Sequence, residues 1–185
     1  LAAIATPTRR PGPAGPRAGS LGHASAWGRH GGCGLIVAMA ASPLRFPRVA
    51  LVGRLESPGI AEPLAHLAAF LAGRGHAVVL GAETATHHPL PGYRSAPAAE
   101  MDRHADLIIV IGGDGTMLSI ARQVAPFDLP LVGINQGRLG FLTDIPLAAM
   151  ETTLAAMLDG RFVEERRTLL DTQVNGDRAV ALNDV

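Results

Sequence analysis

The segment Leu-Ile-Ile-Val-Ile at residues 107–111 is apolar at every position, and a glycine-rich turn follows it directly. A strand with apolar side chains on both faces needs cover on both faces, so it belongs in the middle of a parallel sheet flanked by helices. Hydrophobic residues make up 48% of the 185-residue chain, which is enough for a sizeable core. This segment therefore predicts an α/β fold with residues 107–111 as a central strand.

Strand and helix patterns alternate around this segment. The predicted strands are residues 48–53, 77–80, 107–111 and 130–134, and the predicted helices contain residues 64–71 and 115–124. The polar, proline-containing residues 81–100 are predicted to be a loop. This alternation indicates a doubly wound, Rossmann-like domain over residues 39–146.

The character of the chain changes after Pro146. Residues 147–158 have the spacing of a helix, and residues 162–174 alternate as a strand does. Asn175-Gly176 is a hairpin signal before another short strand at residues 179–182. We expect residues 147–185 to be a connecting helix and the first hairpin of an all-β domain that this chain leaves truncated.

The first 48 residues contain six arginines and no acidic residue, and residues 1–34 are rich in proline and glycine. An arginine-rich, acid-poor start is one property of organelle transit peptides. The alternative, which we favour, is that residues 1–38 are a non-native or disordered extension and that Met39 is the true start.

Charge and composition exclude several classes of function. The 16 basic residues, all arginine, balance 16 acidic residues, so no net charge favours nucleic acid or an anionic membrane. The absence of lysine excludes a Walker-type phosphate loop and Schiff-base chemistry. Cys33 is the only cysteine, so a disulfide framework is excluded as well.

The turn Gly112-Gly113-Asp114-Gly115-Thr116 joins the central strand to a helix. We expect its glycines to adopt positive φ and to let a ligand approach, while the N–H groups that begin the helix favour phosphate. Asp114 is unusual in such a turn. It could accept a proton from an attacking hydroxyl, help to hold a metal that bridges phosphates, or merely cap the helix.

Three motifs give the chain a resemblance to a known family. Residues 112–116 are similar to the phosphate-donor signature shared by NAD kinases, diacylglycerol and sphingosine kinases and, in variant form, phosphofructokinases. Residues 133–143, Gly-Ile-Asn-Gln-Gly-Arg-Leu-Gly-Phe-Leu-Thr, resemble a segment that NAD kinases have and lipid kinases lack. Asn183-Asp184 resembles an Asn-Glu pair of NAD kinases, with the shorter acid in place of Glu.

The resemblance to NAD kinases implies transfer of the ATP γ-phosphoryl group to the 2′-hydroxyl of the adenosine ribose of NAD. Asp114 would accept the proton of that hydroxyl, Gly115 would contact NAD beside it, and Asn183 and Asp184 would hydrogen-bond the dinucleotide. The turn that faces the phosphates would consist of Gly112, Gly113, Gly115 and Thr116.

The second motif supplies further candidates. We expect Asn135, Gly137 and Gly140 to shape the loop beside the site, with plain turn chemistry as the alternative for Asn135 and Gly137. Phe141 is expected to pack under this loop rather than to stack on adenine.

The resemblance also implies cofactors and partners. Mg²⁺ or another divalent metal would enter with ATP, and no metal ligands are assigned. We expect NAD and ATP, or polyphosphate, as partners, no nucleic acid and no membrane, a homo-oligomer at full length and a cytoplasmic location. A lipid kinase and a non-catalytic nucleotide-binding module are the alternatives.

Overall fold

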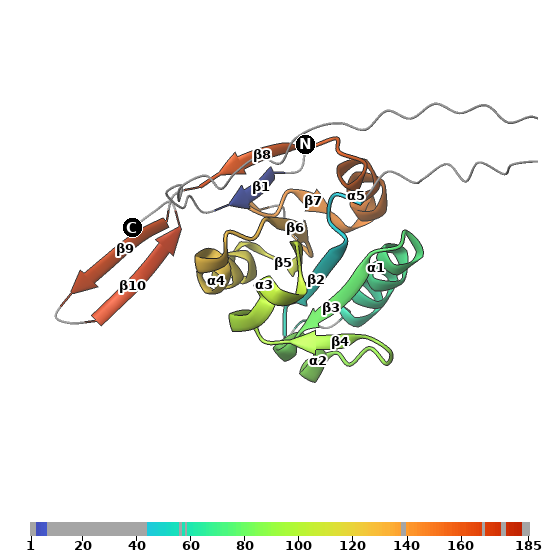
Figure 1. The fold of residues 1–185 in the computed structure, drawn as a ribbon, viewed down its shortest axis with the longest axis horizontal. Helices are drawn as coiled ribbons and strands as arrows, with labels where there is room; N and C mark the ends of the chain where they lie inside the picture. Colours follow the sequence, from blue (N-terminus) through green and yellow to red (C-terminus); the bar gives the residue numbers. More distant parts are fainter. Residues whose placement is uncertain are drawn as a thin grey trace, which may run out of the picture. The chain divides into compact units, whose positions relative to one another are not determined.

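The structure is a computed structural model that describes residues 3–6, 44–55, 57, 59–137, 140–167, 169–174 and 177–182. Five neighbouring strands run parallel, namely β4 (Arg94–Ala96), β3 (Ala77–Gly81), β2 (Arg48–Gly53), β5 (Leu107–Gly112) and β6 (Leu131–Asn135). In this order they make up most of an eight-stranded sheet (Figure 1). β5 lies between β2 and β6 and is buried along its whole length, as its apolar sequence predicts.

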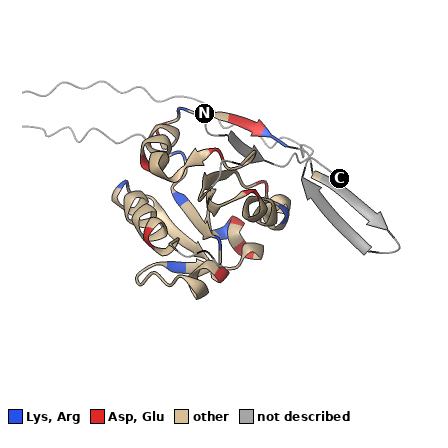
Figure 2. Ribbon diagram, turned by 180° about the vertical axis from the view of Figure 1, so that it is seen from behind, with Lys and Arg blue, Asp and Glu red and all other residues tan. Residues whose placement is uncertain are grey.

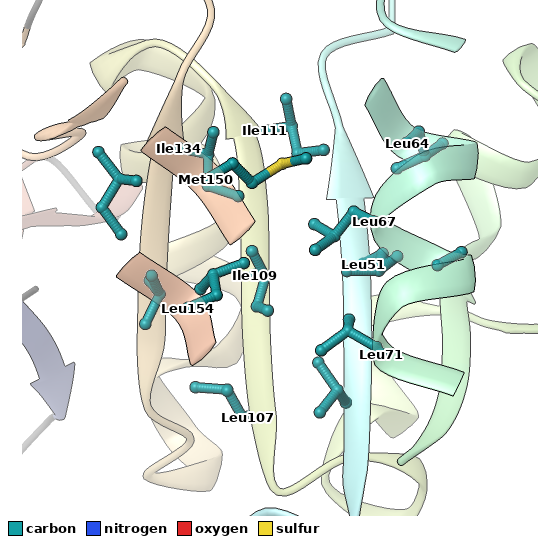
Figure 3. Close-up of a cluster of buried hydrophobic side chains, with 14 of the residues drawn as sticks. Leu51, Leu64, Leu67, Leu71, Leu107, Ile109, Ile111, Ile134, Met150 and Leu154 are labelled. Carbon is teal, nitrogen blue, oxygen red and sulfur yellow. The ribbon is translucent and has the colours of Figure 1, made fainter. Parts of the chain in front are cut away.

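Helices cover both faces of this sheet. α1 (Ala61–Gly73) and α5 (Met150–Leu158) pack on one face, where Leu107, Ile109 and Ile111 of β5 meet them (Figure 3). α3 (Met101–His104) and α4 (Asp114–Val124) contribute to a second cluster around Ile108 and Val110. Since alternate side chains of one strand enter two cores, the prediction of a doubly wound α/β domain is confirmed.

The chain reverses its direction of winding between β2 and β5. From β2 it proceeds outward to β3 and β4, and it then returns to place β5 on the other side of β2, followed by β6. In open α/β sheets such a switch point leaves a crevice at the carboxyl ends of the strands, where ligands bind. Here these ends carry the loop after Gly53 and the glycine-rich turn after β5.

The predicted loop over residues 81–100 is wrong. It contains α2 (Ala82–His87), β4, the 3₁₀ helix η1 (Ala98–Glu100) and, directly after it, α3. α2 has a tertiary anchor, because the buried Thr84 hydroxyl accepts a hydrogen bond from the Gly53 N–H at 3.0 Å. Contacts of this kind override weak local patterns, and elements this short have too few residues to show a period.

Two regions differ from the predicted strand pattern. The sequence did not predict β1 (Ala3–Thr6), which pairs antiparallel with β6 and parallel with β8 (Val163–Arg166). The single strand expected over residues 162–174 is divided into β8 and β9 (Leu169–Val174). β9 pairs antiparallel with β10 (Asp177–Leu182), as the hairpin signal predicts, although residues 175–176 lie outside the described part. The proposed domain boundaries, including the extension 1–38, stay predictions.

The remaining elements lie between α4 and α5. These are the 3₁₀ helix η2 (Ala125–Phe127), the short strand β7 (Ile145–Pro146), which pairs with β6, and the 3₁₀ helix η3 (Leu147–Ala149). Acidic and basic residues are dispersed over the described ribbon, and β8 at the sheet edge is the element most marked by charge (Figure 2). None of the described helices has the length and apolar character needed to cross a membrane.

Candidate functional site

Asp114 is the first residue of α4, directly after the turn that ends β5. The helix is capped by Gly113, whose carbonyl accepts hydrogen bonds from the N–H groups of Thr116 at 3.0 Å and Met117 at 3.1 Å. The Asp114 carboxylate makes no capping hydrogen bond to this helix. The interpretation of Asp114 as a mere helix cap is therefore wrong, and its side chain is used elsewhere.

The carboxylate of Asp114 binds the second motif instead. Oδ2 accepts a hydrogen bond from the Phe141 N–H at 2.8 Å. Oδ1 accepts from the Leu142 N–H at 3.0 Å and from the N–H and the hydroxyl of Thr143, both at 3.1 Å. Two motifs that lie far apart in the sequence thus meet at one side chain.

Thr143 and Asn135 extend this contact into the core. Both side chains are buried. The Asn135 Nδ2 donates to the Thr143 hydroxyl oxygen at 3.0 Å and to the Thr143 carbonyl at 3.2 Å. Asn135 therefore ties Thr143 to the end of β6, and its site-shaping role stays a prediction.

The pKa of Asp114 reflects two opposing influences. Burial, the largest one, raises it, because a charged carboxylate loses hydration. The hydrogen bonds from Phe141, Leu142 and Thr143 lower it, because they stabilise the charged form. Together they outweigh burial, so the pKa lies below its ordinary value and Asp114 is ionised at neutral pH.

The glycines of the first motif do not have the positive φ that we expected, whereas Gly137 of the second motif does. What distinguishes these positions is how much room there is for a side chain. A Cβ on Gly112 would lie 2.8 Å from the Thr116 hydroxyl oxygen, so this position is closely packed. A Cβ on Gly113 or Gly115 would meet no atom within 4 Å, which leaves room for a ligand beside the first turn of α4.

The second motif has two glycines for which a side chain has no room. A Cβ on Gly140 would lie 2.1 Å from Oδ1 of Asp114, and one on Gly133 would lie 2.7 Å from Cγ2 of Thr143. Both positions must lack a side chain for the loop to reach the carboxylate. Gly137 has a φ of 134°, a conformation that side chains rarely adopt, so turn chemistry contributes at that position.

Phe141 does not pack under this loop, contrary to the expectation. Its side chain is 97% exposed, although its own N–H is bound to Asp114. An aromatic ring exposed to this degree offers a flat apolar surface to a ligand.

A cleft of about 680 Å³ lies at the switch point. This volume is within the range of about 300–1,000 Å³ that is common for small-molecule sites. Its walls are the ends of β2 and β3, α2, η1, the start of α3 and one side of α4 along its whole length. Polar lining residues include the exposed Arg54 and Glu83 and the half-buried Thr116 and Ser119.

Two further residues at this edge were not predicted as part of the site. The Ser57 hydroxyl donates to Oε1 of Gln136 at 2.9 Å, and the Gln136 N–H donates to the Gly112 carbonyl at 3.1 Å. They join the loops after β2 and β6 across the end of β5. No local pattern could have identified them, because the contact spans 79 positions of the sequence.

The predicted site residues differ in how far the structure locates them. It brings Asp114 together with Asn135, Gly140 and Phe141, whereas Asn183 and Asp184 lie outside the described residues. Among the residues that are described, no group of three or more His, Cys, Asp or Glu side chains could hold a metal ion.

Comparison with known proteins places this geometry in context. The ATP-NAD kinase N-terminal domain family matches residues 51–162. The chain is 50% identical over 145 residues to the NAD kinase of Burkholderia multivorans, covering 76% of this chain and 48% of that protein. It is 51% identical over 146 residues to the NAD kinase of Burkholderia pseudomallei, with 76% and 49% covered. The chain thus spans about half the length of the curated relatives it matches.

A solved structure shares the fold. The crystal structure of yeast NADH kinase complexed with NADH matches with a TM-score of 0.56 at 16% sequence identity. The match covers 76% of this chain and 47% of the yeast chain. At this identity it supports the α/β architecture alone.

Proposed function

The chain belongs to the NAD kinase family, and on that premise we propose that the protein transfers the γ-phosphoryl group of ATP to the 2′-hydroxyl of the adenosine ribose of NAD. The observation that carries this proposal is the contact between its two motifs. Asp114 of the glycine-rich turn is held by the NAD kinase-like segment through four hydrogen bonds. The lipid kinase alternative loses support, because lipid kinases lack the segment that makes this contact.

In the proposed reaction Asp114 accepts the proton of the 2′-hydroxyl while the hydroxyl oxygen attacks the γ-phosphorus. The bond from that phosphorus to the β–γ bridging oxygen breaks, and ADP leaves. An ionised carboxylate suits this role, because it has an acceptor lone pair and needs no deprotonation first. Mg²⁺ would enter as part of the ATP complex and neutralise the phosphate charge.

The cleft at the switch point is suited to the donor. It is next to the open space beside Gly115 and contains the start of α4, where N–H groups and the helix dipole favour phosphate. Arg54 in its wall could pair with a phosphate oxygen. NAD would then lie on the side of Asp114 that carries Phe141, with Asn183 and Asp184 as its predicted partners.

The test is an assay of NADP formation from NAD and ATP. Because the relatives are about twice as long, residues 1–185 and the complete reading frame are assayed side by side, with polyphosphate as an alternative donor and diacylglycerol as an alternative acceptor. NADP formation by the complete protein supports the proposal. Phosphorylation of the lipid alone, or binding of both nucleotides without transfer, contradicts it.

A further inference from the structure

The orientation of Asn135 determines where the proton of the Thr143 hydroxyl points. The Thr143 carbonyl can only accept a hydrogen bond, and the Asn135 amide lies 3.2 Å from it. The amide atom that faces Thr143 must therefore be Nδ2, a donor. The same Nδ2 lies 3.0 Å from the Thr143 hydroxyl oxygen, so that oxygen acts as the acceptor.

A hydroxyl has a single proton to donate. Because the Thr143 oxygen accepts from Asn135, its proton is directed to Oδ1 of Asp114, 3.1 Å away. Both Asn135 and Thr143 are buried, so water does not compete readily for these hydrogen bonds. The result is a one-way chain of donors from the core to one oxygen of the carboxylate.

The two oxygens of Asp114 are therefore not equivalent. Oδ1 accepts three hydrogen bonds, from the Leu142 N–H and from the N–H and hydroxyl of Thr143. Oδ2 accepts one, from the Phe141 N–H. Since a carboxylate oxygen has about two lone-pair positions, Oδ1 is fully used and Oδ2 keeps acceptor capacity.

We propose that Thr143 is a positioning residue, oriented by Asn135, which occupies Oδ1 of Asp114 and leaves Oδ2 as the atom that receives the substrate proton. The proposal rests on the proposed function, because it concerns the same transfer step. In that step the proton of the acceptor hydroxyl moves to Oδ2, while the hydroxyl oxygen bonds to phosphorus and the bridging P–O bond breaks. Thr143 is buried, so in this proposal it acts through Asp114 and not by contact with a substrate.

Two pairs of variants that differ by a single hydroxyl test this role. Wild-type Thr143 is compared with Thr143→Val, and Thr143→Ser with Thr143→Ala, in the complete protein. Loss of the hydroxyl should lower kcat about 10- to 100-fold in both pairs, the scale of one hydrogen bond to a charged group, while KM for ATP changes little. It should also raise the pKa of Asp114, so that the acidic limb of the kcat/KM profile moves to higher pH.

The serine variant separates positioning from packing. It keeps the hydroxyl and loses a methyl group, so its acidic limb should stay where the wild-type limb lies. If Ser and Ala variants lose kcat equally with an unmoved acidic limb, Thr143 is only a packing residue and the proposal is wrong. An unchanged kcat in both hydroxyl-free variants also overturns it.

A readout without activity distinguishes this proposal from the proposed function. The carboxyl ¹³C resonance of Asp114 is titrated by NMR in the wild type and in the three variants. A higher midpoint in the Val and Ala variants, with no change for Ser, supports the role of Thr143 even if no NADP is formed. Midpoints that coincide in all variants refute it even if NADP is formed.

Discussion

Two aspartates lie at the two ends of β5 and are stabilised by different means. Asp106 precedes the strand and pairs with the Arg48 guanidinium, at 2.6 Å from Nη2 to Oδ1 and 3.1 Å from Nε to Oδ2. Asp114 follows the strand and is bound by three backbone N–H groups and one hydroxyl. The first carboxylate meets a full positive charge, and the second meets only neutral dipoles.

The pKa of both carboxyls is lowered, but the causes differ. For Asp106 the main cause is the hydrogen bond from the Arg48 side chain. For Asp114 burial raises the pKa, and hydrogen bonds from the loop outweigh that effect. The negative charge of a carboxylate paired with arginine is offset by its partner. A carboxylate held by neutral dipoles keeps its full negative charge, which can attract a proton or a cation. The comparison indicates that Asp106 is structural and that Asp114 is available for chemistry.

The largest effect is expected from exchanging each carboxyl for an amide. Asp114→Asn should lower turnover by about two to four orders of magnitude, the scale of a lost general base, because an amide accepts no proton at neutral pH. Asp106→Asn, the matched control, should lower the melting temperature and leave turnover within about threefold of wild type. NADP formation and thermal unfolding are measured for both. Near-normal turnover of the Asp114 variant would show that it is not the base.

A smaller loss should follow from moving Asp114 without changing its chemistry. In Gly140→Ala the new Cβ would lie 2.1 Å from Oδ1 of Asp114, so the loop and the carboxylate must separate. We expect turnover to fall about 100-fold, as is typical for a displacement near 1 Å at a reacting group. Gly73→Ala, which meets no atom within 4 Å, is the control and should leave kcat unchanged. Equal turnover of the two variants would argue against the loop as the support of Asp114.

A further pair of variants tests whether a ligand enters the open space beside the first turn of α4. Gly115→Ala fits the unliganded fold, since its Cβ meets nothing within 4 Å. Its stability should equal or exceed that of the wild type, because alanine favours a helix by about 1 kcal/mol over glycine. Nucleotide affinity should nevertheless fall about tenfold if phosphate or ribose approaches there, as measured by calorimetric titration. Gly112→Ala should instead lower stability, because its Cβ would lie 2.8 Å from Oγ1 of Thr116.

The smallest effect concerns salt and acid. Because the folded-state pKa of both carboxyls is lowered, their contributions to stability are complete above the ordinary value of about 3.9 and are lost as pH falls through the folded-state value.

At neutral pH, about 1 M salt should weaken the Asp106 pair, which is partly exposed, and leave the dipole contacts of Asp114 almost unchanged. Urea unfolding of wild type and Asp106→Asn at low and high salt measures this. A salt effect of equal size in both proteins would contradict it.

The sequence predicted the elements whose pattern is strong and continuous. β2, β3, β5, β6, α1 and α4 all follow from apolar runs or helical spacing. The short elements α2 and β4 depend on contacts such as that of Thr84 with Gly53, which no local pattern contains. The first motif likewise identified Asp114 but left three possible roles for it. Only its hydrogen-bond partners in the folded chain exclude the role of a helix cap.

The errors at the site have the same physical origin. The glycines near Asp114 suggested unusual φ values, whereas Gly140 and Gly112 are required by the distance to a neighbouring side chain. Thr143 lies within the second motif, but its contact with Asp114 spans 29 positions and left no periodic signal. The sequence predicts that Phe141 packs under the loop, but its side chain is exposed. Burial of a loop residue depends on which other elements cover it, and composition does not contain that information.

The tight fit at Gly133 and Gly140 affects how a deep mutational scan of this protein should be interpreted. Every residue other than glycine adds a Cβ, and at these positions the Cβ would collide with Thr143 or Asp114. Both positions should therefore tolerate no replacement, as a ligand-binding position would, although the collisions are internal to the chain. Protein abundance and enzymatic activity should therefore be scored separately. Substitutions at positions 133 and 140 should lower both, whereas substitutions at position 115 should lower activity alone.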